Sequence, residues 1–362
     1  MKVFLDIYLA LNLGDDLFLE IILKRYPNVT FVVNYTGKIY KEFFKKYQNV
    51  EKRKYTIFHK ILRRLNIYNH LENYDAIASE CKCAIFLGGS IFRDEPYHDT
   101  LYLDRTRILN SFLKKNKKIF VIGSNFGPSV NNSFYLDYYK FFKNCEDVCF
   151  RDNYSFEKFS TLNNIRKAND IVFSLDVERF KNIDRMKVIG YSVIDFNHKF
   201  GLKKYNNLYI ENMIKSIKIM IKRGYKCEIL SFCEAEGDLL IAERIKKGLN
   251  FEEEKSLSIY NYLGDIDETI KKIASYEYFI AGRFHANVLG LLLGVKVCPI
   301  IYNQKTLNLL NDLNYNGKVI TVDKLYELSK MEFINKLETY ELPKDKIIDA
   351  ENQFLKLDIE LR

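Results

Sequence analysis

Arg283 and His285 are the two residues of this sequence best suited to hold an anion and to move a proton. They lie in the short segment 282–285 (GRFH), between the apolar stretches 278–281 and 286–293. An arginine presents a planar fork that matches a carboxylate or a phosphate, and a histidine exchanges a proton near neutral pH. The alternative is structural: a buried arginine pairs with an acid, and the histidine bonds a backbone carbonyl.

Two more cations follow apolar runs in the same way. Arg151 comes directly after 148–150, and Lys305 closes the segment 302–305, which follows 296–300. Both are candidate contacts for an anionic ligand. The alternatives are a local ion pair for Arg151 and an ordinary surface position for Lys305.

Asp15 and Glu234 are the candidate general bases. Asp15 stands with Asp16 at the start of a predicted helix, where a carboxylate suits the helix dipole but would repel a phosphate. Glu234 follows a predicted strand that ends near Ser231, a place from which it can take a proton or hold a sugar hydroxyl. A capping role for Asp15 and an exposed loop position for Glu234 are the alternatives.

Three glycine-bearing turns also follow predicted strands. Glycine lets a backbone approach a ligand closely, and it also makes tight turns. The turns are 12–16 (NLGDD), 88–90 (GGS) and 123–128 (GSNFGP), and none is a Walker loop or a GxGxxG fingerprint. The candidate binding residues in them are Asn12, Gly88, Gly89, Ser90 and Asn125.

These residues need a framework of strands and helices to position them. Short runs rich in Val, Ile and Phe alternate with segments of helical period, which indicates βαβ units and parallel sheets. A first series has predicted strands at 2–8, 29–33, 84–87, 118–122 and 148–150, with helices at 16–25, 101–115 and 134–144. A second has strands at 187–193, 226–231, 278–281 and 296–300, with helices around 207–223, 236–248, 286–293 and 306–313.

The polar segment 176–185 has no clean period and marks the expected domain boundary. We predict an α/β fold of two Rossmann-like, doubly wound domains in tandem, at 1–178 and 179–342. We predict a C-terminal helix within 343–362, of a kind that can cross back onto the first domain. Ligands of open α/β sheets bind at the carboxyl ends of strands. The candidate residues, which all follow strands, are therefore expected to face a cleft between the domains.

Composition narrows the class of protein. The 362 residues are 48% hydrophobic and 28% charged, which is typical of a soluble globular protein. The N-terminal stretch predicts a strand rather than a signal peptide, and no segment predicts a membrane span. Seven cysteines without an export signal favour reduced thiols in a cytoplasm, and their spacing predicts no metal site. The net charge of +9 is spread along the chain, so a nucleic-acid partner is not expected.

The order of these motifs resembles the polysaccharide pyruvyl transferase family. The matching elements extend from residue 12 to residue 305, and the Gly-Arg-aromatic-His segment before an apolar helix is the most specific of them. Phe284 stands where Leu is more usual in the family. The elements are 12–15, 88–90, 123–128, Arg151-Asp152 with Ser155, 282–286 and 302–305.

The resemblance implies a fold similar to B-type glycosyltransferases and a transferase that moves pyruvate from phosphoenolpyruvate onto two sugar hydroxyls as a ketal. For this reaction we assign Arg283 and Arg151 to the donor's anionic groups, with Arg151 on the acceptor-side domain, and His285 to proton transfer or phosphate contact. Lys305 is a further donor contact, and Asp15 or Glu234 is the acceptor-side base.

The resemblance also implies a saccharide acceptor of polysaccharide or cell-envelope biosynthesis. The reaction requires no metal in principle, so we expect no cofactor or metal, and the cysteines without an export signal favour a cytoplasmic location. Whether the acceptor is lipid-linked, with the enzyme at the inner membrane face, stays open. Two alternatives also stay open: a nucleotide-sugar-dependent glycosyltransferase of the same fold, and a non-catalytic sugar-binding relative.

Overall fold

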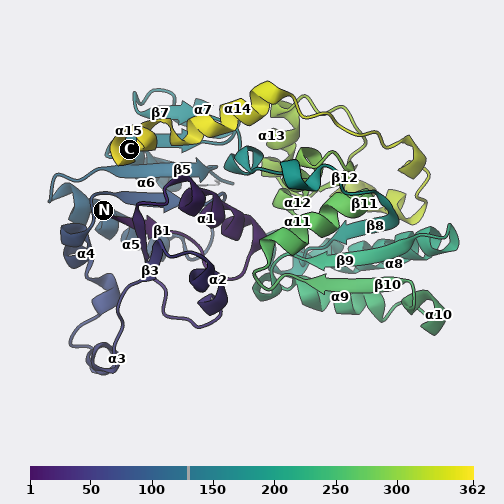
Figure 1. Ribbon diagram of the computed structural model, residues 1–362, viewed down its shortest axis with the longest axis horizontal. Coiled ribbons are helices and arrows are strands. Elements are labelled where there is room, and N and C mark those ends of the chain that lie inside the picture. The colour runs from purple at the N-terminus through teal and green to yellow at the C-terminus, as the bar shows by residue number, and fades with distance from the viewer. Residues whose placement is uncertain (129–130) are drawn as a thin grey trace. The chain divides into compact units, whose positions relative to one another are not determined.

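The chain folds into two units, each built on a parallel sheet with helices packed on it (Figure 1). The computed structural model describes residues 1–128 and 131–362. One compact unit comprises Met1–Leu9, Phe18–Ser174 and Ile348–Arg362, and the other Ala10–Leu17 and Leu175–Ile347. The segment 10–17, which contains the first turn of helix α1, is therefore described with the second unit.

The sheet of the first unit has seven strands in the order β3-β2-β1-β4-β5-β6-β7, all parallel. The order runs outward in both directions from the β1/β4 pair, which is the doubly wound arrangement. Strands β4 and β5 are buried throughout, as expected for central strands covered on both faces. The strands are β1 (Lys2–Asp6), β2 (Thr30–Val33), β3 (Val50–Lys52), β4 (Ala84–Leu87), β5 (Ile119–Ser124), β6 (Asp147–Phe150) and β7 (Ile165–Lys167).

Helices connect these strands, and the C-terminal helices close the unit. The Gln353 side chain accepts from Gly123 N (2.9 Å) and donates to Ala168 O (2.8 Å), so the C-terminal segment is bonded to the end of β5 and to the loop after β7. The helices are α1 (Leu13–Arg25), α2 (Lys41–Lys46), α3 (Ile57–Arg64), α4 (Tyr74–Glu80), α5 (His98–Leu113), α6 (Asn132–Lys143), α7 (Asn153–Phe159), α14 (Lys344–Glu351) and α15 (Leu355–Leu361).

The second unit repeats the arrangement with six parallel strands in the order β10-β9-β8-β11-β12-β13. Its switch point lies between β8 and β11, where the chain order reverses. The strands are β8 (Met186–Ser192), β9 (Lys226–Ser231), β10 (Leu257–Asn261), β11 (Tyr276–Ala281), β12 (Lys296–Ile301) and β13 (Ile320–Thr321). The helices are α8 (Asn206–Lys222), α9 (Asp238–Lys246), α10 (Phe251–Glu254), α11 (Ile266–Ser275), α12 (Phe284–Leu292) and α13 (Gln304–Asp312).

The predicted fold class is confirmed, and the differences concern sheet edges. The sequence predicted five and four strands, whereas the sheets have seven and six. The unpredicted strands β3, β7, β10 and β13 are edge or near-edge strands of two to five residues. Edge strands are only partly buried, so their sequences, such as VEK in β3 and IRK in β7, lack the apolar run that marked the central strands. None of the helices in the described ranges is long and apolar enough to cross a membrane.

Candidate functional site

Arg283 lies at the switch point of the second sheet, in the turn from β11 to α12. It is the residue before the first helical one, and its backbone N–H donates to Ser192 Oγ at the end of β8 (3.2 Å). The buried Asn287 side chain donates to the carbonyl of Arg283 (2.9 Å) and fixes the same turn from inside α12. Arg283 therefore lies at a strand-to-helix turn, as the sequence predicted.

The Arg283 guanidinium is buried and paired with two carboxylates. Its Nε donates to Asp238 Oδ2 (2.9 Å) and its Nη1 to Glu236 Oε2 (2.6 Å), while Nη2 donates to Asp238 Oδ1. This is the arginine–acid pair of the structural alternative. A guanidinium has five N–H donors, so one hydrogen on each Nη is not used by these carboxylates.

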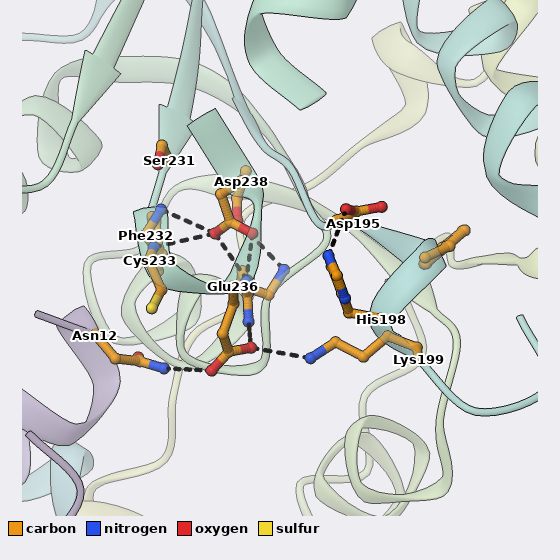
Figure 2. Close-up of polar contacts among 12 residues, drawn as sticks. Asn12, Asp195, His198, Lys199, Ser231, Phe232, Cys233, Glu236 and Asp238 are labelled. Atoms are coloured by element: carbon orange, nitrogen blue, oxygen red, sulfur yellow. Dashed lines mark hydrogen bonds and ion pairs between the residues drawn. The ribbon is translucent and has the colours of Figure 1, made fainter. Parts of the chain in front are cut away.

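Glu236 joins several donors around one carboxylate (Figure 2). Besides Arg283, Lys199 donates to its Oε2 (2.9 Å) and the Asn12 side-chain amide to its Oε1 (3.2 Å). Burial opposes ionisation of this carboxyl, but the attraction of Arg283 and Lys199 outweighs it and holds the pKa of Glu236 well below its ordinary value. Glu236 is therefore a stable carboxylate and a poor proton acceptor near neutral pH.

Asp238 anchors the loop that follows β9. Its side chain is fully buried and accepts the backbone N–H groups of Phe232 and Cys233 (both 3.1 Å), as Figure 2 shows. Because the same carboxylate binds Arg283 in a bidentate manner, the loop after β9 and the turn after β11 are fixed to each other. The charges of this group balance, since two cations, Lys199 and Arg283, meet two anions, Glu236 and Asp238.

His285 packs on the backbone of the first turn of α1. A Cβ added to Gly14 would lie 1.9 Å from Nδ1 of His285, so only glycine leaves room for the imidazole there. Asn12 begins that helix, because its Oδ1 accepts the backbone N–H of Gly14 (3.0 Å). Asn12 thus bonds both Glu236 and the turn against which His285 rests.

Lys305 lies close to the same turn. Its ammonium sits over the ring of Phe284, 5.6 Å from the ring centre, in the first turn of α13. Phe284 stands between Arg283 and His285, so the structure brings the predicted cation Lys305 to the GRFH segment. Phe284, the residue that departs from the family's usual Leu, provides this contact.

The two predicted general bases lie in the loop after β9 and in the first turn of α1. Glu234 is exposed and accepts from the side chain of Asn261 (2.7 Å), in agreement with the loop-position alternative. Asp15 is half-buried in the first turn of α1, where its charge suits the helix N-terminus.

The remaining predicted residues gather in the first unit, at the carboxyl ends of β4, β5 and β6. Arg151 donates to Asp170 Oδ2 (2.8 Å) and to Asn125 Oδ1 (2.7 Å), and the Ser90 hydroxyl donates to the same Asn125 oxygen (3.0 Å). A Cβ on Gly89 would lie 2.5 Å from Nη1 of Arg151, so this glycine admits the guanidinium. Gly88 accepts from Ser124 Oγ (2.7 Å) and completes the cluster.

Sequence reasoning missed the acids and the cation that surround Arg283. It chose Glu234, although Glu236 and Asp238 of the same EAEGD segment make the buried contacts. It also missed the loop after β8, where Lys199 binds Glu236 and the buried Asp195 holds His198 (3.4 Å between Oδ2 and Nε2; Figure 2). Their position was the available signal: one loop follows β8, which borders the switch point, and the other follows β9, the strand beside β8.

The second-unit site combines an imidazole, an ammonium group and an anchored carboxylate–guanidinium network at one sheet edge. Such a set can bind an anion and move a proton without a metal. Within the described ranges, no group of three or more His, Cys, Asp or Glu is arranged to hold a metal ion.

The family model described as polysaccharide pyruvyl transferase matches residues 12–304. No curated protein gives a significant match to the sequence. Among solved structures, Anabaena HepE in complex with UDP and glucose has a TM-score of 0.63 at 12% identity, covering 99% of this chain and 98% of that one. UDP-GlcNAc 2-epimerase from Methanocaldococcus jannaschii has a TM-score of 0.59 at 9% identity, covering 99% and 100%. At these identities the likeness shows the fold, which is that of B-type glycosyltransferases.

Proposed function

We propose that this chain, which belongs to the polysaccharide pyruvyl transferase family and is a transferase, moves pyruvate from phosphoenolpyruvate onto two hydroxyls of a sugar. The product is a cyclic pyruvate ketal, and inorganic phosphate leaves. The observation that supports this best is the gathering of His285, Lys305 and the spare N–H groups of Arg283 at one strand-to-helix turn.

The charge balance of the site separates the cations that pair with protein carboxylates from those that can bind an anionic substrate. Arg283 and Lys199 are offset by Glu236 and Asp238, so an anionic donor needs further positive charge. In this proposal Lys305 and protonated His285 supply it, and Arg283 adds directed hydrogen bonds from its remaining N–H groups. Asp238 and Glu236 hold Arg283 in place and thereby fix the turn that presents His285.

The chemistry proceeds in two additions. A proton is delivered to the methylene carbon of the enol, and the neighbouring carbon, now electrophilic, is attacked by the first hydroxyl. The bond to the phosphate oxygen then breaks, phosphate departs, and the second hydroxyl closes the ketal. The two hydroxyl protons balance the proton gained by the methyl group and the one taken up by the leaving phosphate.

His285 is the proposed proton donor or phosphate contact, and Asp15 or Glu234 the acceptor-side base. Glu236 is not a candidate for that base, because its pKa is held low by Arg283 and Lys199 despite burial. Arg151, with Asn125, Ser90, Gly88 and Gly89, is proposed as the polar substrate-binding set of the first unit.

Ligand stabilisation distinguishes this function from its alternatives. A ligand present at 100 times its Kd stabilises the folded protein by about 2.7 kcal/mol, which thermal unfolding detects. We expect phosphoenolpyruvate to raise the unfolding temperature and UDP-glucose, with which Anabaena HepE has also been solved, not to raise it. Stabilisation by UDP-glucose alone would favour a glycosyltransferase. Stabilisation by phosphoenolpyruvate without phosphate release from any of a panel of glycans would favour a non-catalytic relative.

A further inference from the structure

Helix α3 (Ile57–Arg64) exposes an apolar face that no part of the described chain buries. The helix has no buried residue, although half of its residues are apolar. The exposed fractions are 75% for Ile57, 65% for Phe58, 50% for Ile61 and 60% for Leu65. Single exposed apolar residues are ordinary on protein surfaces, but a contiguous group on one short helix marks an interaction surface.

The spacing of these residues puts them on one side of the helix. Ile57, Ile61 and Leu65 recur every four residues, and Phe58 lies beside them. His59 belongs to the opposite side, where its ring stacks on that of His70 at 3.9 Å, so α3 rests on its own unit through that side. Figure 1 shows α3 apart from the sheet of this unit. The apolar side is thus the outward one.

The same segment is basic throughout. Between residues 52 and 71 the sequence has no Asp or Glu. The exposed cations on or beside the helix are Lys54, Lys60, Arg63 and Arg64. Within the part of the chain that the structure describes, Lys60, Arg63 and Arg64 form no salt bridge, so their charge is not neutralised by the protein.

We propose that α3, with its apolar face Ile57, Phe58, Ile61 and Leu65 and its flanking cations, docks the protein on an anionic lipid bilayer. An interfacial helix buries its apolar side at the boundary between headgroups and acyl chains, while lysine and arginine reach anionic headgroups. A second copy of this chain is a poorer occupant, because a symmetric contact through α3 would bring the unpaired cations of both copies together. This inference is independent of the reaction proposed above.

The absence of tryptophan from the sequence provides a direct probe. Phe58→Trp makes the only tryptophan of the protein, and it lies within the proposed face. We expect its emission to shift to the blue on adding vesicles of equal parts phosphatidylcholine and phosphatidylglycerol, and to stay unshifted with phosphatidylcholine alone. The matched control is Phe251→Trp on α10, which is 74% exposed but is followed by Glu252, Glu253 and Glu254, and should not shift with either vesicle.

Vesicle co-sedimentation of the full chain separates the two contributions. Ile61→Ser with Leu65→Ser should abolish binding, and Lys60→Gln or Arg64→Gln should each weaken it about fivefold, with binding by the intact protein falling as salt rises. An unshifted Phe58→Trp emission with anionic vesicles would overturn the proposal. A blue shift of the Phe58→Trp emission that depends on protein concentration and not on lipid concentration would also overturn the proposal. It would indicate that α3 is a contact between copies of the chain.

Discussion

Gly14 and His285 are in such close contact that a Cβ at position 14 would lie 1.9 Å from the Nδ1 atom of the imidazole. The glycine belongs to the first turn of α1 and the histidine to the first turn of α12, so the contact joins two helix starts. Asn12 supports this contact. Its side-chain oxygen accepts the backbone N–H of Gly14 at the start of α1, and its amide donates to Glu236, which also binds Arg283. The position of the proposed proton donor is therefore set by a residue far away in sequence.

Gly14→Ala should impair catalysis without unfolding the protein. Alanine has the higher helix propensity, so its local effect on stability is neutral or favourable. The imidazole, however, must move by more than 1 Å to escape the new methyl group, and a displacement of that size costs about 10²-fold in rate. Phosphate release from phosphoenolpyruvate, measured beside the unfolding temperature, checks the prediction.

A double variant makes that test specific. His285→Asn alone should lower kcat by about 10²- to 10⁴-fold in a folded protein. If Gly14 acts only through His285, then adding Gly14→Ala to His285→Asn should cost no further activity. Losses that multiply would show that Gly14 matters for another reason.

Lys305→Met should raise the KM for phosphoenolpyruvate about 10- to 100-fold, because the charged hydrogen bond from the Lys305 ammonium to an anionic group of phosphoenolpyruvate is lost. Methionine keeps most of the packing against Phe284, so stability should change little. Lys330→Met is the matched control, since Lys330 also lies over an aromatic ring, that of Tyr326 (5.8 Å), and should leave the KM unchanged. Equal effects of the two substitutions would remove Lys305 from the site.

Arg283→Met should destabilise the fold by about 3–5 kcal/mol, because it leaves the fully buried Asp238 without its bidentate partner. Changing Asp238→Leu as well removes the stranded carboxylate and should restore part of the loss. Urea unfolding of the wild type, both single variants and the double variant gives the coupling between the two residues. A double variant as unstable as the sum of the single ones would mean that the pair does not hold the turn.

Glu236 should contribute stability above its ordinary pKa of 4.5 and lose it under acid conditions. Burial disfavours the carboxylate, but Arg283 and Lys199 lower its pKa in the folded state below that of the unfolded chain. The folded state therefore binds fewer protons, and the stabilisation disappears as pH falls through the folded pKa. Unfolding free energies of the wild type and Glu236→Gln should converge as pH falls below about 4.5. Parallel curves would show that the carboxylate charge does not matter.

The sequence predicted the central framework because buried parallel strands are continuous apolar runs and their ends are turns. The segment 278–285 shows this, since the strand ends at Ala281 as predicted and the helix begins at Phe284, two residues before its predicted start. Edge strands such as β13 (Ile320–Thr321) were missed because two residues, of which only Ile320 is fully buried, are too few to form an apolar run.

The side-chain contacts of the site were harder to predict from the sequence than the strands and helices. Glu234 and Glu236 differ by two residues, and only the tight turn after β9 decides that Glu236 meets Arg283 while Glu234 meets Asn261. The contact of Gly14 with His285 joins positions that no local pattern connects. Tertiary packing, rather than spacing along the chain, determines such pairs.

Ketal formation in D₂O tests the proposed reaction most directly. Because the methylene carbon of phosphoenolpyruvate gains one proton from the site, the product glycan should carry a pyruvate ketal whose methyl group holds one deuterium, with one phosphate released per ketal. NMR and mass spectrometry of the glycan read this out, with His285→Ala as the inactive comparison. Phosphate release without a ketal, or a glycosyl residue added from UDP-glucose in its place, would contradict the account.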